Sequence, residues 1–275
     1  MTRGKQVELI DEIAEEAFAI LGTGQQVAPF SLRYPALDLA TAYKVAAQVR
    51  DMRGARGENA IGRKIGFTNR AVWGGYGILA PIWNYMFDST VKDLTAANET
   101  FALVDLPEPR IEPEIVLHLT SAPHAGMTER ELFDCIDWVA HCFEIVHSIF
   151  PGWAFKAADA VAAYGVHSAL LLGDRHEISR KPAQWAEALS SFTVELVGDD
   201  GTSRPGHAQN VLGGPLKALQ FLVEELARYP ASEPLRPGEL VTTGTLTEAM
   251  PVGIGQTWST QLSGIDIQGL RLRFR

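Results

Sequence analysis

The sequence predicts an α+β fold in which a helical N-terminal portion precedes a largely β body. Apolar residues recur at helical spacing over residues 6–22 and 38–53, and Gly54 and Gly57 end the second helix. From residue 101 onward, short segments that alternate polar and aliphatic residues are typical of strands. The regular strand–helix alternation of a doubly wound sheet is not seen in the sequence.

Local patterns predict the elements that follow residue 100. A capping box of Thr128 and Glu131 opens a helix through about Ala140. Pro215 begins a helix with one apolar stripe, which runs to about Arg228. The other expected elements are a short helical piece at 157–164, a hairpin strand at 192–197 before the turn at 199–201, and strands at 111–119, 142–148, 168–172, 239–245, 257–262 and 265–274.

A change in composition near residues 88–100 predicts a domain boundary. Residues 60–90 are rich in glycine and aromatic residues, a composition suited to loops and short strands that wrap a site. We expect residues 1–90 to form a mainly helical N-terminal subdomain and residues 91–275 to form a β-rich catalytic domain.

Composition excludes several classes of protein. The 275 residues are 46% hydrophobic and 21% charged, which is typical of a globular protein. The net charge is −9 and no long basic run occurs, so nucleic acid is not an expected partner. Cys135 and Cys142 do not form a disulfide framework. The sequence contains no run of about 18 apolar residues, so no membrane span is expected. The N-terminal residues lack a signal-peptide core, so we expect a cytoplasmic protein.

Three carboxylates are candidates for a metal site. Glu112 and Glu114 are two residues apart in a predicted strand, so their side chains share a face and repel unless a cation lies between them. Glu144 lies among apolar neighbours, where a carboxylate is rarely buried unless it is paired or binds a metal. A hard cation such as Mg²⁺ or Mn²⁺ takes oxygen ligands of this kind. Solvated strand edges are the alternative interpretation for both segments.

Two further segments carry candidate site residues. Lys64 lies between glycines and aliphatic residues, where partial desolvation would fit it for proton transfer or for holding a carboxylate. The alternative is a surface lysine beside a turn. Residues 242–247 combine hydroxyls with a glycine turn, which can form a small anion cradle. An ordinary strand end is the alternative there.

Taken in order along the chain, these segments resemble the 2-keto-4-pentenoate hydratase and 4-oxalocrotonate decarboxylase family, which belongs to the fumarylacetoacetate hydrolase superfamily. The segments GRKIGFT, PRIEPEIVLHL, FEIVHS, VLGGPLKAL and PGELVTTGTLT carry the resemblance, which runs from about residue 40 onward. It implies a mixed β-roll core of the fumarylacetoacetate hydrolase C-terminal-domain type, a bound Mg²⁺ or Mn²⁺, small 2-oxo acid substrates and a homo-oligomer.

The resemblance also implies roles for individual residues. Lys64 corresponds to the active-site lysine of the family, and it lies in the predicted N-terminal subdomain. The implied metal ligands are Glu112, Glu114 and Glu144. The implied substrate-binding residues are Thr68, Gly244, Thr245, Leu246 and Thr247.

Two segments depart from the family pattern. His147 and Ile149 replace the Asp and Arg of an E-x-x-D-S-R motif, and Gly75 stands where the hydratases carry an Asp. His147 follows Glu144 by three residues, so strand alternation points the two side chains to opposite faces. We therefore expect that His147 is not a metal ligand, and that the chain differs from the hydratases in its acid–base groups and its choice of substrate.

The sequence thus predicts a metal-dependent lyase that hydrates a 2-oxo-4-enoate in aromatic catabolism. The metal would act as a Lewis acid on the 2-oxo group. Three alternatives remain: decarboxylation of a 2-oxo dicarboxylic acid, hydrolysis of a C–C bond as elsewhere in the superfamily, and binding of a 2-oxo acid without catalysis.

Overall fold

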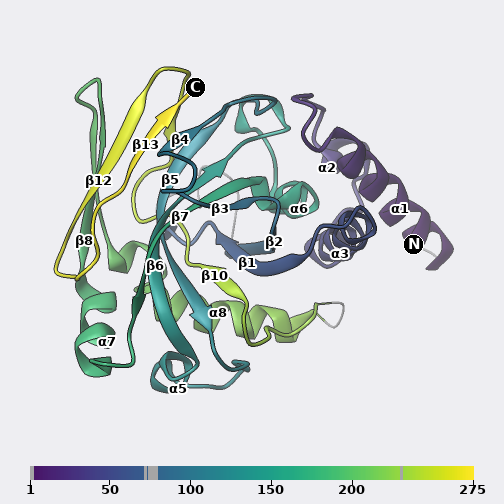
Figure 1. The fold of residues 1–275 in the computed structure, drawn as a ribbon. Coiled ribbons are helices and arrows are strands. Elements are labelled where there is room, and N and C mark those ends of the chain that lie inside the picture. The colour runs from purple at the N-terminus through teal and green to yellow at the C-terminus, as the bar shows by residue number, and fades with distance from the viewer. Residues whose placement is uncertain (1–2, 71–72, 74–79, 230–231) are drawn as a thin grey trace.

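The computed structural model describes residues 3–70, 73, 80–229 and 232–275, which form two sheets with helices around them (Figure 1). The predicted α+β class is confirmed. The helices are α1 (Arg3–Ile20), α2 (Phe30–Arg33), α3 (Leu39–Ala55), α5 (Glu129–Phe133), α6 (Ala157–Ala162), α7 (Pro182–Ser191) and α8 (Pro215–Arg228). The strands are β1 (Ala60–Gly66), β2 (Ile82–Phe87), β3 (Val91–Asp93), β4 (Thr100–Phe101), β5 (Arg110–Leu119), β6 (Ile136–Val146), β7 (His167–Glu177), β8 (Thr193–Gly198), β9 (Ser203–His207), β10 (Leu240–Thr242), β11 (Met250–Pro251), β12 (Thr257–Ser263) and β13 (Arg271–Phe274).

The larger sheet is mixed and has the strand order β2-β1-β10-β5-β6-β7-β3, with β11 paired to the start of β5. The pairs β1–β10 and β3–β7 are parallel, and the remaining pairs are antiparallel. Glu112 on β5 lies directly opposite Glu144 on β6, and Glu114 lies two residues further along β5. Because strand residues two apart share a face, this register places all three glutamates on one face of the sheet.

The smaller sheet has the order β4-β13-β12-β8-β9 and stands at the left in Figure 1. It packs against the larger sheet through a cluster of buried residues that includes Phe143, Ile145, Trp258 and Leu272. Phe143 and Ile145 alternate with Glu144 along β6, so the apolar face lies opposite the glutamate face. One sheet face is therefore committed to the core, and the other is available for a polar site.

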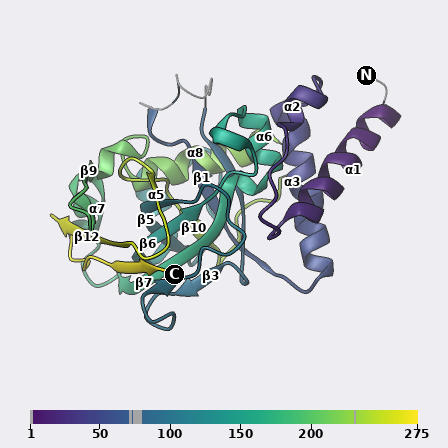
Figure 2. The ribbon, with the colours of Figure 1, turned by 90° about the horizontal axis from the view of Figure 1, so that it is seen from above.

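The helices α1, α2 and α3 lie together on one side of the molecule, as the view from above shows (Figure 2). The short helix α6 packs against all three of them and against β2. Asp159 in α6 is buried, but it accepts hydrogen bonds from the Ser31 backbone N–H and hydroxyl at 2.7 Å. That carboxylate therefore joins α2 to α6. None of the described helices has both the length and the apolarity needed to cross a membrane.

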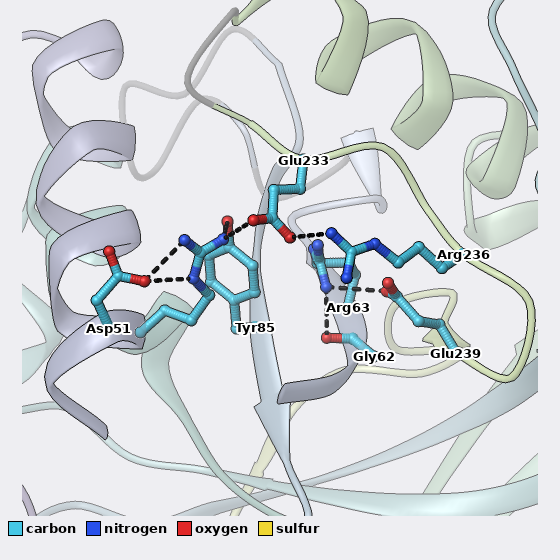
Figure 3. A network of polar contacts seen from close by, with 8 residues as sticks. Asp51, Gly62, Arg63, Tyr85, Glu233, Arg236 and Glu239 are labelled. Atoms are coloured by element: carbon cyan, nitrogen blue, oxygen red, sulfur yellow. Dashed lines mark hydrogen bonds and ion pairs between the residues drawn. The ribbon is translucent and has the colours of Figure 1, made fainter. Parts of the chain in front are cut away.

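A polar network joins β1 to α3 and to the connection before β10 (Figure 3). Arg63 donates a hydrogen bond to Glu239 at 2.9 Å, and its guanidinium carbon lies 4.2 Å from the centre of the Tyr85 ring. Arg50 from α3 also lies over Tyr85, at 5.1 Å, and it forms an ion pair with Glu233 at 3.2 Å. The network fixes β1 from the side opposite Lys64, since neighbouring strand residues point to opposite faces.

Several sequence predictions can be compared with these elements. The helix from Pro215 to Arg228 is confirmed, as are the strand at 111–119 and the hairpin, which β8 and β9 form. The helix predicted through Ala140 is wrong beyond Phe133, because β6 begins at Ile136. Its capping box is present. The last predicted strand begins only at residue 271, and α7 was not predicted. The boundary near residue 90 stays a prediction.

Candidate metal site and cavity

Three glutamates converge at the centre of the larger sheet. One carboxylate oxygen from each of Glu112, Glu114 and Glu144 lies within 4.8 Å of the other two. Glu114 and Glu144 are fully buried, and Glu112 is half-buried. The structure therefore brings together the three residues that the sequence proposed as ligands.

Two basic side chains contact Glu144. The Lys64 ammonium from β1 lies 3.3 Å from Glu144 Oε2 and is itself buried. The His167 ring, at the start of β7, lies 2.7 Å from Glu144 Oε1 through Nδ1. The other ring nitrogen of His167 lies 3.0 Å from the Thr90 hydroxyl. Glu144 is thus held from both sides, whereas Glu112 and Glu114 have no such pair of partners among the described residues.

The pKa values of the three glutamates differ because only Glu144 has two basic partners. Burial raises the pKa of Glu112 to about 7, with a further contribution from the charge of Glu144. Burial and the two neighbouring carboxylates raise the pKa of Glu114 well above its usual value. Burial acts against ionisation of Glu144 as well, but Lys64 and His167 together lower its pKa. Lys64 and Arg110 lower the pKa of Glu112, and Lys64 lowers that of Glu114, but these charges do not offset burial and the neighbouring carboxylates.

The donor atoms fit a divalent cation. Glu114 Oε1 is buried and accepts no hydrogen bond from the described residues, and the ammonium of Lys64 is the described contact of Glu144 Oε2. A buried carboxylate oxygen without a partner is costly. Three carboxylates and one ammonium leave two negative charges in excess, which one divalent ion balances. Carboxylate oxygens are the ligands that Mg²⁺ and Mn²⁺ prefer.

Glu112 and Glu114 form part of the wall of a cavity of about 360 Å³. Lys64 and Thr68 reach it from β1 and the residues after it, and Arg110 reaches it from the start of β5. The Thr68 hydroxyl is buried and has no hydrogen-bond partner within the part of the chain that the structure describes. The full lining is Lys64, Gly66, Phe67, Thr68, Asn69, Arg110, Glu112, Glu114, Trp153, Val166, Thr245, Thr247, Glu248 and Ala249.

The turn after β10 requires glycine at position 244. Its φ of +91° lies in the left-handed region, and an added Cβ would lie 1.9 Å from the hydroxyl oxygen of Thr68. The Gly244 N–H donates to Glu114 Oε2 at 2.8 Å. A bare backbone at this position therefore lets the turn bind a metal-site carboxylate while Thr68 lies against it.

Some of the residues predicted to bind substrate line the cavity, and one of them does not. Thr245 and Thr247 line the cavity, as does Thr68, whereas Leu246 is fully buried behind the turn and its carbonyl accepts a hydrogen bond from Asn210. Their substrate-binding roles stay predictions.

His147 is buried and belongs neither to the cavity lining nor to the group of candidate ligand atoms in the described residues. Burial lowers the pKa of His147 to about 4. Gly75 lies outside the described residues.

Sequence reasoning missed three residues of this region: His167, Arg110 and Trp153. The contact of His167 with Glu144 depends on how β6 and β7 pair, and no local pattern signals it. Arg110 had a signal, because it precedes Glu112 by two residues in a strand and so shares its face. Trp153 comes from the connection between β6 and α6, which no periodic pattern marks.

Comparison with known proteins identifies relatives along nearly the whole chain. No protein-family model matches. A 2-hydroxyhexa-2,4-dienoate hydratase of Comamonas testosteroni is 27% identical over 259 residues, which cover 94% of this chain and 95% of the relative. A 2-keto-4-pentenoate hydratase of Burkholderia vietnamiensis is 28% identical over 247 residues, which cover 88% and 89% of the two chains.

Solved structures show the same fold. The 4-oxalocrotonate decarboxylase of Pseudomonas putida G7, complexed with magnesium and adipate, superimposes with a TM-score of 0.85 at 22% identity, covering 100% of this chain and 99% of the other. A fumarylacetoacetate hydrolase family protein of yeast superimposes with a TM-score of 0.53 at 14% identity, covering 78% and 91%. The chain is therefore a homologue of the 2-keto-4-pentenoate hydratases and has the fold of the fumarylacetoacetate hydrolase superfamily.

Proposed function

We propose that the protein is a divalent-metal-dependent lyase that hydrates 2-hydroxydienoates, the enol forms of 2-oxo-4-enoates. The observation that carries the proposal is the excess of negative charge on three converging glutamates, two of which line a cavity of small-molecule size. The named activities of the sequence relatives support the same chemistry. The overall reaction adds water across the C4–C5 double bond, with the hydroxyl at C4, and the 2-hydroxy enol becomes the ketone of a 4-hydroxy-2-oxo acid.

Glu112, Glu114 and Glu144 would hold the ion, Mg²⁺ or Mn²⁺. Such an ion, when bound, acts as a Lewis acid that polarises the 2-oxo group of the substrate. Gly244 fixes one oxygen of Glu114 through its N–H, and His167 fixes one oxygen of Glu144. These two contacts leave the other oxygen of each carboxylate, Glu114 Oε1 and Glu144 Oε2, facing the shared space.

Lys64 supplies the fixed positive charge of the site. Its ammonium lies in the cavity wall, where it can hold the substrate carboxylate or move a proton at the reacting chain. Thr68 and Thr245 also line the cavity, and the Thr68 hydroxyl has no hydrogen-bond partner among the described residues. These groups orient an acidic substrate. His147 is not placed to exchange protons with it, because its side chain lies outside the lining.

Purified protein tests this function directly. Hydration of 2-hydroxypenta-2,4-dienoate and of its longer homologues should be followed by loss of dienoate absorbance, before and after treatment with EDTA. Activity that disappears with EDTA and returns with Mg²⁺ or Mn²⁺ supports the proposal. Full activity in a verified metal-free sample would contradict it. Because Gly75 replaces an Asp of the hydratases, we expect weak turnover of the five-carbon substrate.

Decarboxylation of a 2-oxo dicarboxylic acid is the second candidate function. The superposition on the 4-oxalocrotonate decarboxylase over the full chain favours it, although that match at 22% identity concerns the fold alone. Release of CO₂ from such a substrate, with no hydration of dienoates, would establish decarboxylation instead. Tight metal binding without turnover of any 2-oxo acid would indicate a binding protein.

We also infer that the protein forms a homo-oligomer, as the resemblance of its sequence implies, and that it is located in the cytoplasm. Light scattering on the purified protein tests the first inference, and a mass of about 30 kDa would contradict it. Fractionation of the source cells tests the second.

A further inference from the structure

Three consecutive residues between α6 and β7 have the left-handed backbone conformation. The φ angles of Tyr164, Gly165 and Val166 are +57°, +63° and +59°. Such a run is rare, because in this conformation Cβ lies too close to the following carbonyl oxygen, and a β-branched residue such as Val166 is an outlier there. A costly conformation persists only where the surrounding contacts determine it. The contacts of residues 164–166, the left-handed turn, therefore indicate what its conformation provides.

Hydrogen bonds hold the left-handed turn at both of its ends. The Tyr164 hydroxyl donates to the carbonyl of Ala17 in α1. The Val166 carbonyl accepts a hydrogen bond of 2.9 Å from the backbone N–H of His147, just after β6. Val166 also lines the cavity beside the metal site. The turn is therefore fixed between a helix on one side and the end of a glutamate-bearing strand on the other.

The middle residue of the turn lies against the side chain of Lys64. A Cβ added to Gly165 would lie 3.2 Å from Cδ of Lys64 and 2.9 Å from Cβ of Asn84. Lys64 and Asn84 are directly opposite each other in the β1–β2 pair, so their side chains share a face of the sheet. The bare backbone of Gly165 therefore covers the aliphatic stem of Lys64 at a distance that a side chain would prevent.

The ammonium end of Lys64 is confined as well. The side chain is almost fully buried, and its Nζ lies 3.3 Å from Glu144 Oε2. A Cβ added to Gly66 in β1 would lie 3.3 Å from this Nζ. Because a lysine has a flexible four-carbon stem, a fixed ammonium requires packing along that stem. Two glycines thus border the space that the Lys64 side chain occupies.

We propose that the left-handed turn is a positioning element, in which Gly165 confines the stem of Lys64 and thereby sets where its ammonium lies relative to Glu144. This inference rests on the proposed function only in that the glutamates hold a divalent ion. A side chain at position 165 would push the stem away, and the ammonium with it. The turn also gives α1 a part in the site, because α1 anchors it through Tyr164.

Gly165→Ala tests the proposal, with Gly22→Ala as its matched control. Gly22 also has a left-handed φ, +72°, but a Cβ added there meets no atom of the described residues within 4 Å. Both variants carry the backbone penalty of alanine in this region, and only Gly165→Ala adds the collision. In a crystal structure of metal-free Gly165→Ala, the distance from Lys64 Nζ to Glu144 Oε2 should exceed the roughly 4 Å limit of an ion pair. An unchanged distance would overturn the proposal.

Metal binding provides a second measurement, by calorimetric titration with Mn²⁺. Gly165→Ala should change the affinity at least about threefold, in the same direction as Lys64→Met, because both take the ammonium away from Glu144. In Lys64→Met protein, Gly165→Ala should add less than about a twofold change, since the charge that it would displace is already gone. Gly22→Ala should keep the wild-type affinity. An equal effect of Gly165→Ala in both backgrounds would show that the turn does not act through Lys64.

Tyr164→Phe keeps the proposal falsifiable if Gly165→Ala does not fold. It removes only the hydroxyl that anchors the turn to Ala17. We expect a smaller change in Mn²⁺ affinity than for Gly165→Ala, again in the direction of Lys64→Met and again absent in the Lys64→Met background. Wild-type affinity in Tyr164→Phe, together with an unfolded Gly165→Ala, would assign the turn to stability alone.

The two proposals fail in different ways. A protein that binds Mn²⁺ and loses the ion pair of Lys64 in Gly165→Ala, but hydrates no dienoate, would retain the positioning role of the turn and lose the proposed function. A protein that hydrates dienoates and keeps Lys64 in place in Gly165→Ala would retain the function and lose the positioning role.

Discussion

Arg63 and Lys64 are neighbours in the chain, both cationic and both almost fully buried, yet they belong to different kinds of environment. Arg63 points to one face of β1, where Glu239 and Tyr85 contact it and the charges are balanced (Figure 3). Lys64 points to the other face, where three carboxylates surround a single ammonium. Burial alone therefore does not identify a functional charge. The imbalance of charge around it does.

The largest expected effect concerns catalysis on the Lys64 face. Lys64→Ala should lower kcat/KM by about 10² to 10⁴, because it removes the charge that orients an acidic substrate or its proton. Steady-state kinetics at saturating Mg²⁺ would measure this effect. Lys92→Ala, an exposed lysine of β3, is the matched control and should keep the wild-type rate. An unchanged rate for Lys64→Ala would assign Lys64 to structure, like its neighbour.

Substitutions on the Arg63 face should change the stability of the protein. Glu239→Gln should lower the free energy of unfolding by about 3 kcal/mol, because it leaves a buried guanidinium without its counter-ion. Urea unfolding would measure the change. Glu233→Gln, which affects the exposed end of the same network, should cost less than about 1 kcal/mol. Equal costs for the two variants would contradict the structural role of the Arg63 pair.

On the Lys64 face, removal of a carboxylate should change the free energy of unfolding in the opposite direction. In metal-free protein, Glu114→Gln should raise the free energy of unfolding by about 1–2 kcal/mol, because it removes a buried, uncompensated carboxylate. Mg²⁺ should then stabilise the wild type but not the variant. Thermal unfolding with and without Mg²⁺ would show both effects. A destabilised metal-free variant would mean that Glu114 is balanced in a way that the described contacts do not reveal.

The smallest effect should come from a residue that acts through another. His167→Gln should weaken metal binding by about tenfold, because His167 orients Glu144. Calorimetric titration with Mn²⁺ would measure the affinity. His118→Gln is the control, since His118 pairs with Asp137 toward the far end of β5. Unchanged affinity in His167→Gln would show that Lys64 and the backbone already fix Glu144.

The parts of the fold that the sequence predicts well are those with one buried face. The helix Pro215–Arg228 has a proline at its start and one apolar stripe, and it was predicted at its observed bounds. The strand β6 is buried on both faces along most of its length, so it lacks the alternation that separates strand from helix. The capping box at Thr128 is genuine but serves a helix that ends at Phe133. Local signals could not show where that helix ends.

Some residues of the candidate site could also be predicted from local pattern, and others could not. The pair Glu112 and Glu114 could be predicted because a period of two is a local property of a strand. The meeting of Glu144 with Lys64 and His167 depends on strand pairing across the sheet, which a single sequence does not encode in any short window. Glu144 and Lys64 were candidates because of their apolar neighbours, and the resemblance to a family implied their roles. It did not supply His167, whose contact only the folded chain reveals.

The order of the strands has a consequence for the synthesis of the protein. β1 joins the sheet through its parallel pairing with β10, where Gly62 lies opposite Leu240, and the N–H that binds Glu114 belongs to Gly244. During translation, Lys64 and the three glutamates are made long before that turn leaves the ribosome. Such a high contact order slows folding. The nascent chain should therefore be unable to complete this site until residue 244 has emerged.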